Sequence, residues 1–457
     1  MTLAEELGAF FAEARPEELP AVAREHGAMV VASTLASAAC GIAIDSTRVL
    51  RSLAEQRGGK AESSLWFTGG RLPAAAAAQV NAVASDAAAS DDSDLRNIVH
   101  AGTPATAVAL ALGEARHAGG AALVAAVVLG YEAAGRIASA ITPGFRRRGF
   151  HGSIGAVFAA AVAAGRLLGL DRRQMAEALG LAATSIGGLT MAADTSTARE
   201  YHAGAATWQG VQAALAAEGG FHGELSVFEG RGGFFSSFGG DDGERAAAAA
   251  REGLGGAYDI VTDMAIKLGP GAHSFHAIAE AAALAAAKGG IAPEEVSVIA
   301  VARPDMAVLS GPLHLTDLIS MAHSPAYFAA AGVADGGLSW AHATPEKITD
   351  ERIHRLIDRV AFLPDPSVEA EADRYRQGAT VTVSGAARRE GRATVYLPNG
   401  AGARGIRWAD VDEKCRALLP EGGLTGAAVE ACLEDLHGLE SLADVAVLSA
   451  LVTPRAG

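Results

Sequence analysis

The sequence has little that would indicate a disulfide scaffold, a membrane protein or a nucleic-acid partner. Its 3 cysteines form no CxxC pair and no metal-ligand spacing, which is typical of a reduced compartment. Asp and Glu outnumber Lys and Arg by 52 to 37, and the net charge of −15 opposes contact with phosphate backbones or anionic membranes. Apolar runs such as residues 119–131 stop short of the roughly 20 residues that span a bilayer. We therefore expect a cytoplasmic protein that binds neither nucleic acid nor membrane.

Aromatic residues are also scarce, at 5%, although half of the chain is hydrophobic. The core must then be built mainly from Ala, Val and Leu, and Ala favours closely packed helices because it loses no side-chain entropy there. Apolar residues recur at helical spacing over 103–118, 121–141 and 155–170, and they cover nearly the whole circumference of each segment. Asp171 precedes a further helical segment as an N-cap. These patterns predict a large bundle of buried helices.

The pattern changes after about residue 265. The β-branched run VSVIAVA (296–302) predicts a strand, the alternating segment 379–400 predicts a β-hairpin, and the Ala-rich segment 276–290 predicts a helix between them. Helical patterns return after about residue 407. The predicted fold is therefore mainly α with an α+β part.

Its large all-helical domain would be built from both chain ends, residues 1–264 and 407–457. A smaller α/β lid domain, residues 265–406, would be inserted between them.

Motifs for metals, nucleotides and nucleophilic serine are missing. Asp91, Asp92 and Asp94 lack the D-x-D-x-D-G spacing of a calcium loop, and no HExxH or Cys/His zinc pattern occurs. The GxSxG elbow and a glycine-rich phosphate loop in a strand-to-helix context are absent too. We therefore predict that the protein uses no metal and no cofactor.

Positive groups in apolar surroundings are the remaining candidates for chemistry. His100 and His151 share one layout, in which a polar stretch and the His are followed by small residues and an apolar helix. Arg199 and His202 lie three residues apart in an Ala/Gly-rich run. Among the five lysines, Lys267 follows an apolar run, whereas the others occupy polar or terminal surroundings, namely Lys60, Lys288, Lys347 and Lys414. Such a set suits proton transfer on a carboxylate substrate, because cations bind the acid and His moves protons near neutral pH.

Several segments together share the pattern of one known family. They are DDS (91–93) with His100, GYEAAGRI (130–137), GFH (149–151), the segment 202–223, Lys267 with His276, and HSPAY (323–327). By these motifs nearly the whole chain resembles the MmgE/PrpD family, which includes 2-methylcitrate dehydratase, cis-aconitate decarboxylase and iminodisuccinate epimerase.

The resemblance implies a homodimer without metal or organic cofactor, and a pocket for a small polycarboxylic acid. The residues that it places there are Asp92, Ser93, His100, His151, Arg199, His202, Lys267, His276 and Tyr327. His100 or His151 would be the base, and Tyr327 would donate a proton. Arg199 and Lys267 would hold substrate carboxylates.

The resemblance further implies a lyase, with 2-methylcitrate-type dehydration as the leading reaction and decarboxylation or epimerisation as alternatives. Three positions depart from the family pattern: Ala89 replaces the first Asp of its Asp-rich loop, Ala101 replaces a Pro, and Arg199 replaces a Lys. The missing Asp motivates a different hypothesis, a family member that binds a carboxylate without catalysis.

Overall fold

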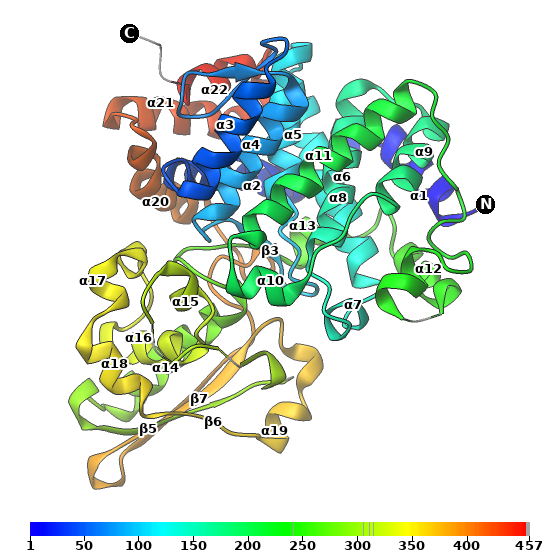
Figure 1. The fold of residues 1–457 in the computed structure, drawn as a ribbon. Coiled ribbons are helices and arrows are strands. Elements are labelled where there is room, and N and C mark those ends of the chain that lie inside the picture. The colour runs from blue at the N-terminus through cyan, green and yellow to red at the C-terminus, as the bar shows by residue number, and fades with distance from the viewer. Residues whose placement is uncertain (241, 305, 310, 314, 454–457) are drawn as a thin grey trace. The chain divides into compact units, whose positions relative to one another are not determined.

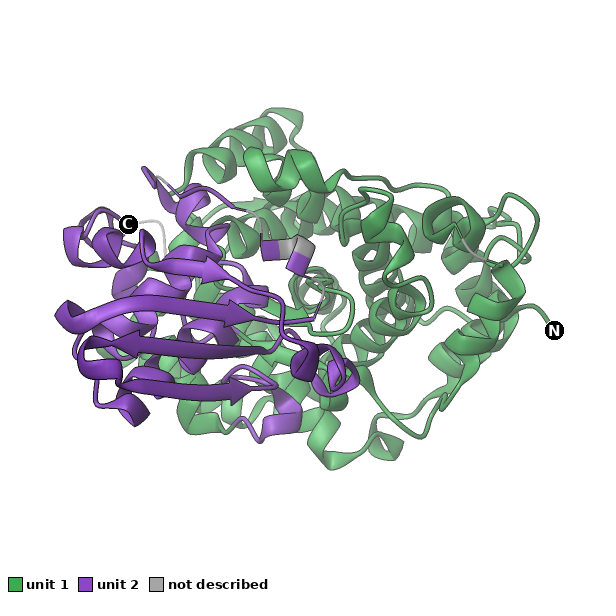
Figure 2. Cartoon of the chain, turned by 90° about the horizontal axis from the view of Figure 1, so that it is seen from below, with its two compact units in different colours: residues 1–266, 407–457 green, residues 267–406 purple. Residues whose placement is uncertain are grey.

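The computed structural model describes residues 1–240, 242–304, 306–309, 311–313 and 315–453. The chain forms two compact units, shown in different colours in Figure 2. The larger unit contains residues 1–266 and 407–457, and the smaller unit contains residues 267–406. The fold is mainly helical with one small mixed sheet, which confirms the predicted fold class.

The larger unit is a helical bundle with two short two-stranded sheets (Figure 1). Its helices are α1 (Leu3–Glu13), α2 (Ala21–Gly41), α3 (Asp45–Arg57), α4 (Ala74–Ala87), α5 (Gly102–Arg116), α6 (Gly120–Ser139), α7 (Gly144–Arg147), α8 (Ser153–Leu168), α9 (Arg172–Ala183), α10 (Thr190–Thr195), α11 (Ala198–Glu218), α12 (Gly243–Arg251), α13 (Asp259–Thr262), α20 (Trp408–Leu418), α21 (Gly426–His437) and α22 (Ala446–Leu451). Its strands are β1 (Ser63–Ser64), β2 (Arg71–Leu72), β3 (Asp92–Asp94) and β4 (Met264–Ile266). The Asp171 side chain caps α9 as predicted, by accepting a hydrogen bond from the Gln174 N–H.

Helix α8 lies at the centre of this unit and packs against α5, α6, α9 and α11. Small residues allow these helices to approach closely. A Cβ atom added to Gly210 on α11 would lie 2.4 Å from the Ala160 Cβ and 2.6 Å from the Val157 carbonyl oxygen of α8. The Ala/Gly-rich run that contains Arg199 and His202 is therefore a helix packing surface, and its charged residues lie near one end of it.

Helix α6 is long and apolar enough to cross a membrane by composition. However, 89% of its apolar window is buried inside the protein, where α6 packs against α5 and α8. Its position is that of a core helix, as the all-round apolar pattern predicted.

The C-terminal helices return to the first helices of the chain. Helix α20 packs against α2, and α22 packs against α5; both appear orange to red beside blue and cyan helices in Figure 1. Val411, Cys415 and Leu418 form the buried side of α20, and the buried Lys414 lies among them. The helical unit is therefore complete only with the last part of the chain.

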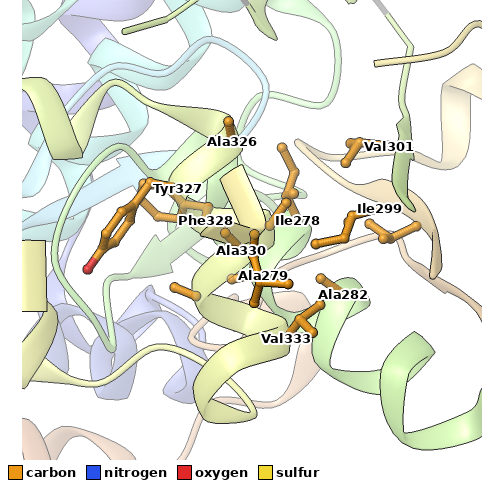
Figure 3. Close-up of a cluster of buried hydrophobic side chains, with 14 of the residues drawn as sticks. Ile278, Ala279, Ala282, Ile299, Val301, Ala326, Tyr327, Phe328, Ala330 and Val333 are labelled. Carbon is orange, nitrogen blue, oxygen red and sulfur yellow. The ribbon is translucent and has the colours of Figure 1, made fainter. Parts of the chain in front are cut away.

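The smaller unit has a four-stranded sheet in the order β6-β5-β7-β8. Its strands are β5 (Val296–Ala302), β6 (Val360–Phe362), β7 (Ala379–Gly385) and β8 (Glu390–Val395), and its helices are α14 (His276–Gly289), α15 (Leu318–Ala322), α16 (Pro325–Asp335), α17 (Pro345–Ile348), α18 (Glu351–Ile357) and α19 (Pro366–Glu369). β5 pairs in parallel with β6 and antiparallel with β7, and β7 with β8 is the predicted hairpin. Helices α14 and α16 fill the core with the inward side chains of the sheet (Figure 3).

Candidate active site

The segment between α4 and α5 carries the aspartates of the predicted site. Ala89 has a φ of 51°, a left-handed conformation that is uncommon for a residue with a Cβ atom. This turn leads through Ser90 and Asp91 into β3, which pairs antiparallel with β4. We call residues 89–94 the aspartate loop, and the side chains of all three of its aspartates are buried.

Asp91 and His100 form a close pair at the start of α5. The His100 Nδ1 atom lies 2.7 Å from the Asp91 Oδ2 atom, which also accepts a hydrogen bond from the Thr103 hydroxyl at 3.3 Å. The carboxylate is fully buried, whereas the imidazole keeps 17% of its side-chain surface exposed. A buried carboxylate that holds one ring nitrogen orients the imidazole for proton transfer through Nε2.

Asp92 and Ser93, which the sequence predicted as substrate-binding residues, turn into the protein. Asp92 Oδ2 accepts the Gly102 N–H at 3.1 Å, so its carboxyl caps the first turn of α5. Burial and the nearby Asp91 raise the pKa of Asp92 to about 6. Ser93 is fully buried in β3. The carboxylate that faces His100 is therefore Asp91, whereas the role of Asp92 and Ser93 in substrate binding stays a prediction.

His151 lies on a turn that packs against the segment before His100. A Cβ atom on Gly152 would lie 2.8 Å from the Ile98 carbonyl oxygen, which shows how closely the two segments approach. The Ser153 N–H donates to His151 Nδ1 at 3.3 Å, so the neutral ring carries its hydrogen on Nε2. Burial, then the charges of His100 and His202, hold the pKa of His151 well below its usual value. This ring is therefore neutral near pH 7.

His202 completes a group of three imidazoles in the larger unit. Its ring centroid lies 5.1 Å from that of His151. Burial lowers the pKa of His202 as well, although the charge of Asp86 opposes this shift. The sequence predicted all three histidines at one site, and the structure brings them together.

Arg199, at the start of α11, is engaged by the end of α4. Its Nε donates to Asp86 Oδ2 at 3.1 Å, and its Nη2 donates to the carbonyl oxygens of Asp86 and Ala87 at 3.0 and 2.9 Å. A guanidinium at a helix C-terminus satisfies carbonyls that lack partners within the helix. Arg199 thus links α4 and α11 through its Nε and Nη2 atoms, and its role as a carboxylate clamp stays a prediction. Asp86 was missed because nothing in its Ala-rich context indicated a charged partner.

Asp86, Asp91 and His100 lie close enough together to resemble a metal site. One ligand atom from each lies within 4.8 Å of the others, a spacing that could hold an ion. In the structure Asp86 Oδ2 accepts from Arg199, and Asp91 Oδ2 is paired with His100 Nδ1. These three side chains are therefore engaged in hydrogen bonds.

Lys267 and His276, two further predicted site residues, belong to the smaller unit. The Lys267 side chain is 2% exposed and follows directly after β4, whose Ile266 pairs with Asp92. His276 is the first residue of α14, and its ring lies 4.9 Å from that of His273. Arg303, which the sequence did not single out, donates to the Ser274 carbonyl oxygen in the same loop. This unit therefore gathers a lysine, an arginine and two histidines around residues 267–276.

Tyr327 lies in the core of the smaller unit. Its ring packs edge-on against Phe328 and His342, and its hydroxyl donates to the Lys347 carbonyl oxygen at 3.0 Å. Figure 3 shows the hydroxyl pointing away from the other labelled side chains. This hydroxyl proton is engaged within the unit in the structure, and the role of Tyr327 as proton donor stays a prediction.

The fold is that of a helical protein with an inserted α/β unit, and its helical unit holds a histidine–carboxylate group. The N-terminal domain model of the MmgE/PrpD family matches residues 5–247, and its C-terminal domain model matches residues 270–434. The chain belongs to the MmgE/PrpD family, which is generally a family of enzymes. A comparison with curated proteins finds no match.

Proposed function

We propose that the protein is a cofactor-independent lyase that transfers a proton beside a carboxylate of a small polycarboxylic acid. The observation that carries this proposal is the His100–Asp91 pair with the His151 and His202 rings in the same unit. The imidazoles differ in their surroundings, since His100 is paired with a buried carboxylate whereas burial keeps His151 neutral, so they can divide the roles of base and acid. The leading reaction is a dehydration of the 2-methylcitrate type.

In this reaction His100 is the base. Asp91 holds Nδ1, so Nε2 takes the proton from the carbon next to the substrate carboxylate, and the buried carboxylate stabilises the imidazolium that forms. His151 is neutral with its hydrogen on Nε2, and it donates a hydrogen bond to the departing hydroxyl. The hydroxyl leaves as water with the proton that the His100 imidazolium gives up, so that His100 returns to its starting state. Preorganised donors at a developing charge supply much of the rate enhancement in such reactions.

A panel of small acids tests the reaction. The protein is incubated with methylcitrate, citrate, cis-aconitate and iminodisuccinate, and absorbance of the alkene, release of carbon dioxide and product chirality are followed. We expect alkene formation from methylcitrate, with and without EDTA. Carbon dioxide from cis-aconitate would indicate the decarboxylase alternative, and a chirality change alone would indicate the epimerase.

The alternative without catalysis is favoured by one departure, the Ala at position 89 where the family has an acidic residue. It predicts that calorimetry detects binding of a polycarboxylate that the protein leaves unchanged. The same panel therefore separates a lyase from a binding protein.

Lys267 remains a predicted carboxylate-binding residue, because a buried ammonium suits an anionic ligand. The K267M variant should raise KM more than it lowers kcat. The matched control is K288M, which removes an exposed lysine from the end of the same unit's α14.

We further infer that the protein is a cytoplasmic homodimer. Support for a partner surface comes from apolar side chains exposed on the helical unit: Met191 on α10 is 73% exposed, Tyr201 on α11 65%, and Val49 on α3 61%. Exposed large apolar side chains mark an interaction surface when they form one contiguous patch. The three cysteines are free thiols, as expected in a reducing compartment. Analytical ultracentrifugation of the native chain and of M191E/Y201E tests the dimer.

A further inference from the structure

Lys414 is a lysine of α20 whose ammonium group reaches the aspartate loop. Its Nζ donates to the Ser33 hydroxyl of α2 at 2.8 Å and to the Ser90 carbonyl oxygen. The side chain is 1% exposed. This contact joins the last part of the helical unit to the residue that precedes Asp91.

Packing alone does not explain a lysine at this position. Burial of an ammonium is costly, and an apolar residue of similar volume would fill the space between α20 and α2 without that cost. The neighbouring thiols of Cys40 and Cys415 stay protonated, because burial raises the pKa of each to about 12. The charge and the donor hydrogens of Lys414 are therefore what distinguish it from its apolar neighbours on α20.

The Ser90 carbonyl belongs to the peptide group that connects Ser90 to Asp91. A hydrogen bond to this oxygen restrains the peptide plane just after the left-handed turn at Ala89, and so restrains the direction in which the Asp91 side chain leaves the loop. Titratable and charged groups near the pair include Asp86, Asp92, His151 and Arg199.

We propose that Lys414 is a positioning residue that holds the aspartate loop so that Asp91 meets His100. The catalytic meaning of this role rests on the proposed function, whereas the positioning itself does not. The ammonium acts through the Ser90 peptide group and has no contact with the reacting atoms.

The test compares K414M, K414Q and K414R with the native chain and with K288M as control. Met removes the charge and the donor, Gln has an amide that is one atom too short to reach Ser90, and Arg keeps a cation. The first readout is the low-field proton resonance of His100 Nδ1–H, assigned by its loss in H100Q. This signal reports the bond to Asp91 and needs no substrate.

We expect the resonance to disappear through solvent exchange in K414M and K414Q and to persist in K414R and K288M. In turnover assays K414M should lower kcat by about 10²-fold with little change in KM, since a displaced catalytic group loses rate on this scale. If K414M does not fold, K414Q decides. A folded K414M or K414Q that keeps the resonance would overturn the proposal. If the native chain turns over none of the acids, the proposed function fails while the resonance still tests the role of Lys414.

Discussion

The His100 Nδ1 atom lies 2.7 Å from the Asp91 Oδ2 atom, across a segment of nine residues that includes β3. The acid is inaccessible to solvent and the imidazole is partly accessible. A substrate can therefore reach the ring but not the carboxylate that orients it. Asp91 therefore orients the His100 ring. The adjacent Asp92 has a different role, because its carboxyl caps α5.

Replacing Asp91 with Asn should lower kcat by about 10²–10⁴-fold, the range of a positioned proton-transfer group. The amide can donate to Nδ1 and so favours the tautomer in which Nε2 cannot accept a proton. The matched control is D92N, whose amide oxygen can still accept the Gly102 N–H and cap α5. Steady-state kinetics of both variants measure the difference. Equal losses in D91N and D92N would contradict the assignment.

The H151A variant should lower kcat by about 10²–10⁴-fold with a smaller effect on KM, because it removes a hydrogen-bond donor at the leaving group. His151 is neutral at all pH values well above its lowered pKa, so its titration should not appear in the kcat profile between pH 6 and 9. Kinetics over this range check both statements. An unchanged kcat in H151A would exclude His151 from the reaction.

Arg199→Ala should mainly destabilise the helical unit. It leaves the buried Asp86 carboxylate and two α4 carbonyl groups without their donor, and removal of one partner of a buried pair costs about 3–5 kcal/mol. Urea denaturation of R199A, D86A and the double variant measures this coupling, and the double variant should be less destabilised than the sum of the single ones. Unchanged stability with a raised KM in R199A would instead restore the carboxylate clamp.

The stability of the protein should respond to pH through Asp94. Burial and the nearby Asp263 raise the pKa of Asp94 to about 7, above the value of about 3.9 in an unfolded chain. The folded state therefore binds the proton more tightly, and stability is lost as pH rises from about 4 to about 7. D94N keeps the acceptor for the Arg96 and Asn97 N–H groups but cannot ionise.

The free energy of unfolding of D94N, relative to the native chain, should therefore increase between pH 5 and pH 8. Urea denaturation at both pH values measures it, with the exposed Asp45 replaced in D45N as control. A difference that does not depend on pH would show that Asp94 is ionised throughout.

The helices and the hairpin follow from local pattern, and for that reason the sequence predicted them. Ala-rich segments at helical spacing became α5, α6 and α8, and the alternating segment became β7 and β8. In such elements the sequence period alone determines which side chains point toward the core. The apolar pattern then shows whether one face or the whole circumference is buried.

The details of the site depend on contacts between distant segments and could not be predicted in the same way. Successive side chains of a strand point to opposite sides, so the left-handed turn at Ala89 decides whether Asp91 or Asp92 faces His100. No residue type signalled that turn, since Ala seldom adopts it. Arg199 was recognised as a special cation, but its partner Asp86 lies 113 residues away. Lys414 looked like a surface lysine because its neighbours in sequence are charged.

The contact between Lys414 and the Ser90 carbonyl also has a consequence for biosynthesis. A ribosome makes the aspartate loop early, but α20 emerges only after the whole smaller unit has been translated. A nascent or truncated chain that ends before α20 lacks the restraint on Asp91, whatever helices it has already formed. Competence for proton transfer would then be acquired only after α20 has been translated, and chains that stop before it would be inactive.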